Sequence, residues 1–70
     1  MMPLTMAKAG ETVTIKKITG KDTTHQFLAS LGFVEGADVT IISELSGNII
    51  LNIKDTRVAI DKSMANRIII

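Results

Sequence analysis

Apolar and polar residues alternate in five stretches of the chain, which predicts five short strands. The first stretch covers residues 12–19, and its alternation is interrupted at Lys16 and Lys17. A bulge at this point would return Ile18 to the buried face of the strand. Short strands separated by turn residues are typical of a small barrel. The other four predicted strands cover residues 38–43, 49–53, 57–60 and 67–70.

One stretch, residues 25–36, has the spacing of a helix followed by a clear stop signal. Asp22 is a good N-cap, so we expect a helix over residues 23–31. Gly32 follows directly and is the residue expected at a left-handed C-terminal cap. This segment therefore predicts one short helix between the first two strands. Its apolar stripe would consist of Phe27, Leu28 and Leu31.

Turn residues separate the later strands. Residues 46–48 (Ser-Gly-Asn) predict a hairpin, residues 54–56 (Lys-Asp-Thr) predict a second turn, and Asp61 predicts the cap of a single helical turn over residues 62–66. The apolar end of the chain, residues 68–70, would be an exposed sticky edge if it stayed unpaired. We expect it to pair with the first strand and so to close the sheet. The predicted fold class is mainly β: a small five-stranded barrel with a helical turn before the last strand.

Composition narrows the class of protein. Seventy residues predict a single domain, residues 1–70, with a small core that 46% hydrophobic residues and only two aromatic residues must fill. There is no cysteine, so disulfides and thiolate metal sites are excluded. Charges of both signs are interspersed, with a net charge of +1. No apolar run predicts a signal peptide or a membrane span, so we expect a soluble cytoplasmic protein without membrane insertion.

The polar residues do not form a catalytic pattern. His25 is the only histidine, and no cysteine or second histidine can complete a metal site with it. Asp22, Asp38, Asp55 and Asp61 stand at predicted caps or turns, where aspartate needs no further explanation. Neither a nucleophile motif nor a glycine-rich phosphate loop is present. We therefore expect no enzymatic activity, no cofactor and no resident metal.

Four apolar residues do not fit the alternation of the strands and the helix. Ile42 and Ile50 break the pattern of two adjacent strands, and Phe33 and Val34 follow the predicted helix cap. These side chains either complete the core of the barrel or form a docking patch for another protein. The sequence alone leaves both interpretations open.

A further pattern extends along nearly the whole chain. It consists of Leu4, Gly10, Val13, Ile15, Ile18-x-Gly20, the run Leu28-x-x-Leu31-Gly32-Phe33-x-x-Gly36-x-x-Val39, then Gly47, Val58-Ala59-Ile60 and Ala65-x-x-Ile68. In this order the residues resemble the FeoA family, small cytoplasmic partners of the bacterial ferrous-iron transporter FeoB. The resemblance implies an SH3-like barrel, no catalysis, and a role in assisting or regulating ferrous-iron uptake by binding the cytoplasmic GTPase part of FeoB.

The chain departs from the family pattern at two places that we expect to be exposed. The family often has arginine just before the first leucine of the helix run, where this chain has residues 25–27 (His-Gln-Phe), and proline before the second glycine, where Glu35 stands. Partner specificity is therefore expected in this part of the chain. The predicted partner-binding residues are His25, Gln26, Phe33, Val34 and Glu35.

Three other hypotheses remain open. Small barrels often bind nucleic acid, and the same fold occurs as a module of some iron-dependent repressors. Nevertheless, this chain has eight basic against seven acidic residues and no Tyr or Trp, so we expect no nucleic-acid partner. A direct iron carrier is suggested only by the implied pathway. A homo-oligomer is plausible, because the core is small and aliphatic surface is left over.

Overall fold

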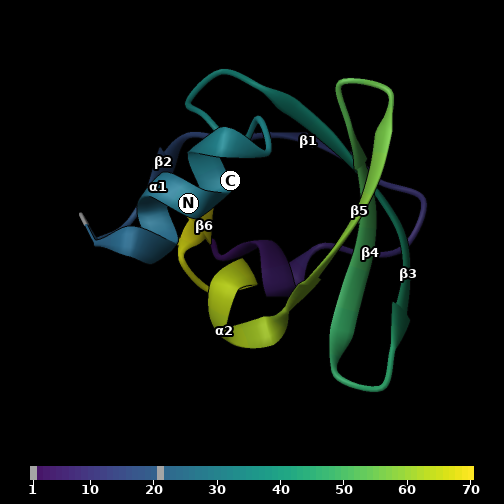
Figure 1. Ribbon diagram of the computed structural model, residues 1–70. Coiled ribbons are helices and arrows are strands. Elements are labelled where there is room, and N and C mark those ends of the chain that lie inside the picture. Colours follow the sequence, from purple (N-terminus) through teal and green to yellow (C-terminus); the bar gives the residue numbers. More distant parts are fainter. Residues whose placement is uncertain (1, 21) are drawn as a thin grey trace.

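The computed structural model describes residues 2–20 and 22–70. Helices and strands follow one another in the order η1, β1, β2, α1, β3, β4, β5, α2, β6 (Figure 1). The strands form a four-stranded sheet in the order β1-β3-β4-β5 and a two-stranded sheet of β2 and β6. The chain is mostly β, as predicted. The bounds are η1 Leu4–Met6, β1 Thr12–Thr14, β2 Lys17–Ile18, α1 Thr23–Ser30, β3 Asp38–Leu45, β4 Asn48–Ile53, β5 Thr56–Asp61, α2 Lys62–Ala65 and β6 Ile68–Ile69.

The predicted first strand divides into β1 and β2, which belong to different sheets. β1 pairs antiparallel with β3, and the Ile15 N–H still donates to the Ala37 carbonyl on that side. One residue later the Lys16 N–H donates to the Ile69 carbonyl, at a distance of 2.7 Å. The irregularity predicted at this point is therefore the place where the chain changes partners. Ile18 is buried as expected.

Two tight turns connect β3, β4 and β5 into a meander. Ser46 and Gly47 form the first turn, with φ of 51° and 82°; Lys54 and Asp55 form the second, with φ of 50° and 63°. Positive φ at both central residues is the geometry of the turn whose twist suits a two-residue hairpin. The predicted hairpin and the predicted second turn are both confirmed, and the second turn, which also closes a hairpin, places two non-glycine residues in the left-handed region.

A bulge in β3 explains why Ile42 breaks the alternation. The register of β3 on β4 shifts between Ile41 and Ser43, so the extra residue Ile42 has no counterpart on β4. A bulge of this kind bends the strand and reorients the side chains around it. Ile41 is buried, whereas Ile42 and Ile50 are half-buried.

The end of the chain lies between β2 and the N-terminal segment and bonds to both. Ile68 pairs with Ile18 in β2, and on the other side Met2 and Ile70 exchange backbone hydrogen bonds of 3.0 and 2.8 Å. The predicted pairing of the chain's end with the first strand is confirmed for β2. The prediction that it closes the sheet is wrong: the sheets stay open, because β1 and β2 separate at Ile15 and Lys16.

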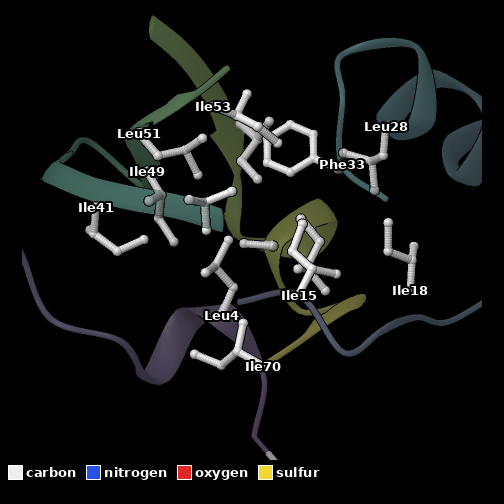
Figure 2. Close-up of a cluster of buried hydrophobic side chains, with 14 residues drawn as sticks. Leu4, Ile15, Ile18, Leu28, Phe33, Ile41, Ile49, Leu51, Ile53 and Ile70 are labelled. Carbon is white, nitrogen blue, oxygen red and sulfur yellow. The ribbon is translucent and has the colours of Figure 1, made fainter. Parts of the chain in front are cut away.

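One hydrophobic cluster fills the space between the sheets, η1 and the helices (Figure 2). Leu4 from η1 is fully buried in it. Leu28 and Phe33 approach the cluster from α1 and the segment that follows it (Figure 2). The core thus fixes where α1 lies against the strands. Its buried members are Leu4, Ile15, Ile18, Leu28, Phe33, Val39, Ile41, Ile49, Leu51, Ile53, Ile60, Ala65, Ile68 and Ile70.

Candidate functional site

The helix α1 begins and ends as its sequence predicts. The Asp22 carboxylate accepts from the His25 N–H at 3.2 Å, which satisfies one of the free N–H groups at the helix start. At the other end, Gly32 has φ of 104°, the Gly32 N–H donates to Ala29, and the Phe33 N–H donates to Leu28. These two bonds form a Schellman cap. The cap turns the chain sharply, so that Phe33 enters the core immediately after the helix.

An ion pair ties the start of α1 to the far end of the chain. Arg67, just before β6, donates to the Asp22 carboxylate at 2.6 Å. This hydrogen bond, together with the cap bond from His25, lowers the pKa of Asp22 from 3.8 to about 2. The same carboxylate therefore caps the helix and anchors it to β6.

His25 is oriented by a local contact. Its Nδ1 donates to the carbonyl oxygen of Gly20. A carbonyl oxygen can only accept, so Nδ1 carries the proton and Nε2 is left as the acceptor of the neutral ring. The imidazole is half-buried and fixed at the first turn of α1.

A shallow depression of about 390 Å³ lies between α1 and the segment that follows the helix. Four of its six lining residues are apolar, His25 and Glu35 supply the charged or titratable groups, and polar and apolar atoms share the surface almost equally. A hollow of this size and character suits one apolar side chain of a partner, with a few polar contacts around it. The lining residues are Ile18, His25, Ala29, Phe33, Val34 and Glu35.

The structure brings four of the five predicted partner-binding residues to this depression: His25, Phe33, Val34 and Glu35. Val34 is 41% exposed and Glu35 is exposed. Gln26 is also exposed, as expected, but does not line the depression.

The prediction that Phe33 contacts a partner needs a correction. Its side chain is 0% exposed and belongs to the core, because the helix cap directs it inward beside Leu28. Of the two interpretations of this residue, completion of the core is the one that the structure supports. Phe33 can contribute only the inner surface of the depression.

Phe27 is the second correction, and it is the exposed residue that the sequence interpretation missed. It was expected to face inward with Leu28, yet it is 51% exposed. Successive residues of a helix lie 100° apart, so Phe27 and Leu28 cannot both point at a narrow core contact. Leu28 and Leu31 are three residues apart and so lie on the same side of α1. This spacing identifies the inward face of the helix.

Within residues 2–20 and 22–70, no three His, Asp or Glu side chains come together in an arrangement that could hold a metal ion. The helices of this part of the chain are too short and too polar to cross a membrane.

The fold and the site define a small SH3-like domain with a helix inserted after the first strands. The model of the FeoA family, described as the FeoA domain, matches residues 2–70. The chain belongs to the FeoA family, which is implicated in ferrous-iron transport. The resemblance inferred from the sequence is thereby confirmed.

Three relatives illustrate the similarity. A protein of Methanocaldococcus jannaschii named as an Fe(2+) transport protein A is 34% identical over 70 residues, which are 100% of this chain and 85% of the relative. The crystal structure of an iron uptake regulatory protein (FeoA) is 31% identical, with a TM-score of 0.86 over 96% of this chain and 89% of that one. The zinc-complexed FeoA of Stenotrophomonas maltophilia, described as a procaryotic SH3 domain protein, shares the fold at 21% identity, with a TM-score of 0.86 over 99% and 88% of the two chains.

Proposed function

We propose that this chain works as one non-enzymatic interaction module in the cytoplasm, and that it assists or regulates ferrous-iron uptake by binding the cytoplasmic GTP-binding part of a FeoB-type transporter. The observation that carries the proposal is the depression beside α1. It is the place where this chain departs from the common family pattern, at His25 and Glu35. Membership of an accessory iron-transport family supports the same role.

The chemistry of the depression suits a mixed contact. Val34 presents exposed apolar surface at its rim, and Ile18 and Ala29 provide apolar walls. Such a hollow accepts an aliphatic or aromatic side chain of the partner, which is the usual form of a binding hot spot. The Glu35 carboxylate and the Nε2 of His25 are acceptors, so they favour a partner that carries donors or a positive charge around that side chain.

Calorimetric titration of the chain with the transporter's cytoplasmic GTP-binding domain, in its GTP and GDP states, tests the proposal. We expect binding that the Val34→Ser substitution weakens by at least about tenfold, as truncation of a hot-spot side chain does. Leu45→Ser is the matched control, because Leu45 is an equally apolar and more exposed residue at the tip of the β3–β4 hairpin (Figure 1). Absence of binding in both nucleotide states contradicts the proposal.

Nucleic-acid binding or a repressor-associated role remains the alternative class. The near balance of eight basic and seven acidic residues gives it no electrostatic support. Filter binding or anisotropy at low salt separates the classes: the interaction module shows no salt-dependent affinity for DNA or RNA.

A further inference from the structure

The strand β5 leaves one edge of the four-stranded sheet free. Within residues 2–20 and 22–70 the order of that sheet is β1-β3-β4-β5, so β5 is hydrogen-bonded to β4 on one side only. β5 is six residues long, whereas β1 at the other edge has three. The helix α2 follows β5 and turns away from this edge towards η1 and β6 (Figure 1). A long free edge is a template on which another strand can pair.

The hairpin geometry shows which backbone groups face outward. The turn Lys54-Asp55 closes on the pair Ile53 and Thr56. In a two-residue hairpin the closing pair exchanges both hydrogen bonds, and bonded pairs then recur at every second residue. Residues 56, 58 and 60 therefore bond to β4, whereas Arg57 and Ala59 direct their N–H and C=O groups, and Asp61 its N–H group, to the free edge.

The outward side chains of the same three residues are exposed, and their order is self-complementary. Arg57, Ala59 and Asp61 are all exposed, while Val58 is half-buried and Ile60 is buried. If two such strands run antiparallel about Ala59, each Arg57 lies opposite the other copy's Asp61, and Ala59 meets its own counterpart. Directly opposite unlike charges stabilise a strand pair, and the small alanine leaves the centre unobstructed.

We propose that β5 is a self-association edge, on which two copies of this chain pair their β5 strands antiparallel with Ala59 at the two-fold axis. The central pair exchanges two backbone hydrogen bonds. Each Asp61 N–H donates to the carbonyl of Arg57 in the other copy. The backbone carbonyl of Asp61 is already used as an acceptor at the start of α2, and the side-chain oxygen Oδ1 caps the same helix. The other side-chain oxygen, Oδ2, is therefore the one that meets the guanidinium of Arg57 in the other copy.

This pairing predicts a closed and weak dimer. It occupies the free edge of β5 in both copies, and a two-fold contact of this kind does not propagate into a filament. Five paired residues make an interface well below the standard size, so association should be concentration-dependent. The surface is separate from the depression beside α1, and the inference does not depend on the proposed function.

Sedimentation velocity of the whole chain, from about 20 µM to about 1 mM, is the first test. We expect the weight-average mass to rise towards twice the monomer mass. Ala59→Pro should abolish this rise without breaking the hairpin, because the Ala59 N–H is not used by β4 and proline is tolerated at such edge positions. Arg57→Glu should abolish it as well, because it sets two carboxylates opposite each other. Lys16→Glu is the control, since it makes the same change in charge at an exposed residue elsewhere.

Cysteine cross-linking tests the register. The chain has no cysteine, so Ala59→Cys introduces one thiol per copy. Bonded antiparallel pairs have Cα atoms about 5.5 Å apart, which lies within the range of disulfides. In a glutathione redox buffer, Ala59→Cys should form a covalent dimer about tenfold faster than Ala9→Cys, an exposed control.

Three results overturn the inference: a monomer at every concentration, unchanged association of both Ala59→Pro and Arg57→Glu, or equal cross-linking of the two cysteine variants. Transporter binding is measured separately with Ala59→Pro, which should bind as the unmodified chain does. Loss of self-association and loss of transporter binding are thereby distinguished.

Discussion

The meander of β3, β4 and β5 is built differently from the seam, which consists of β6 and the segments that bond to it, β2 and residues 2–3. In the meander, neighbouring strands are joined by two-residue turns, so each contact lies close in sequence. In the seam, β6 pairs with β2 on one side and Ile69 forms a single bridge with Pro3 on the other, so the contacts join the two ends of the chain. Short loops cost little entropy to close, whereas end-to-end contacts cost more.

The helix next to the proposed binding site depends on the seam. Its cap residue Asp22 is bonded to Arg67, one residue before β6, and its depression includes Ile18 from β2. The surface that we propose for partner binding is therefore held by the part of the fold with the most distant contacts. The contacts of the seam thus position the site, whereas the meander is built from contacts that are close in sequence.

The largest expected effect is on the free energy of unfolding, and it differs between the buried and the exposed residue of the site. Phe33→Ala removes a fully buried ring from the core and should cost about 3–5 kcal/mol of the free energy of unfolding. A core of this size supplies little more than that, so the variant should be largely unfolded. Val34→Ala, one residue further on and 41% exposed, should change stability by less than about 0.5 kcal/mol. Urea denaturation followed by far-UV circular dichroism measures both, and similar losses in the two variants would refute the expected difference.

Hydrogen exchange compares the seam and the meander directly. The Lys16 and Thr19 N–H groups donate to β6 and to Arg67, within a sheet of two-residue strands. The Leu51 and Ile53 N–H groups lie in the six-residue β4 between two partner strands. We expect the opening free energy of the seam amides to be lower by about 1 kcal/mol or more, because few contacts must break to release them. Equal protection by native-state exchange would contradict this order.

The second hairpin turn offers a smaller change in the opposite direction. Asp55 has φ of 63°, a region that costs a non-glycine residue free energy and that glycine adopts freely. Asp55→Gly should therefore stabilise the meander by about 0.5–1 kcal/mol in thermal or urea unfolding. Gly47→Ala is the matched control in the first turn, where φ is 82°, and should destabilise by a similar amount. A loss of stability in Asp55→Gly would show that its side chain matters more than its backbone.

The smallest expected effect is on pH dependence and belongs to the seam. The pKa of Asp22 falls from 3.8 to about 2, with the Arg67 hydrogen bond as the main cause. Since the pKa is lower in the folded state, the contribution is complete above about pH 4 and is lost as pH falls towards 2. Arg67→Ala should flatten this part of the curve of melting temperature against pH. Asp61, whose pKa is also lowered, by the Met64 N–H and the Ser63 hydroxyl, remains in both proteins and cancels in the comparison. Parallel acid limbs would disprove the role given to Arg67.

The sequence predicted those parts of the fold that local residues determine. Asp22, Gly32, Asp61 and the two hairpin turns act through their own backbone surroundings, so their roles could be inferred without the structure. The division of the first strand could not be foreseen in full, because the change of partner depends on where β6 lies. The sequence also predicted that Gln26 and Glu35 lie at the surface, and both are exposed.

Two aromatic side chains, one within α1 and one just after it, were harder to assign. Phe27 and Phe33 are equally apolar, and only the helix phase and the Schellman cap decide that the first is exposed and the second is buried. Composition cannot show this difference, because it results from the direction of each Cα–Cβ bond on the folded backbone. The pairing of Asp22 with Arg67, 45 residues apart, was likewise beyond local reasoning.

An NMR titration tests the central claim most directly. The isotopically labelled chain is titrated with the transporter's cytoplasmic GTP-binding domain, in the GTP and the GDP states, and amide shift changes are followed for every residue. We expect the changes to concentrate around the depression, at His25, Ala29, Val34 and Glu35, and to leave β5 unaffected. Changes centred on β5 or on the β3–β4 hairpin, or no changes in either nucleotide state, would contradict this claim.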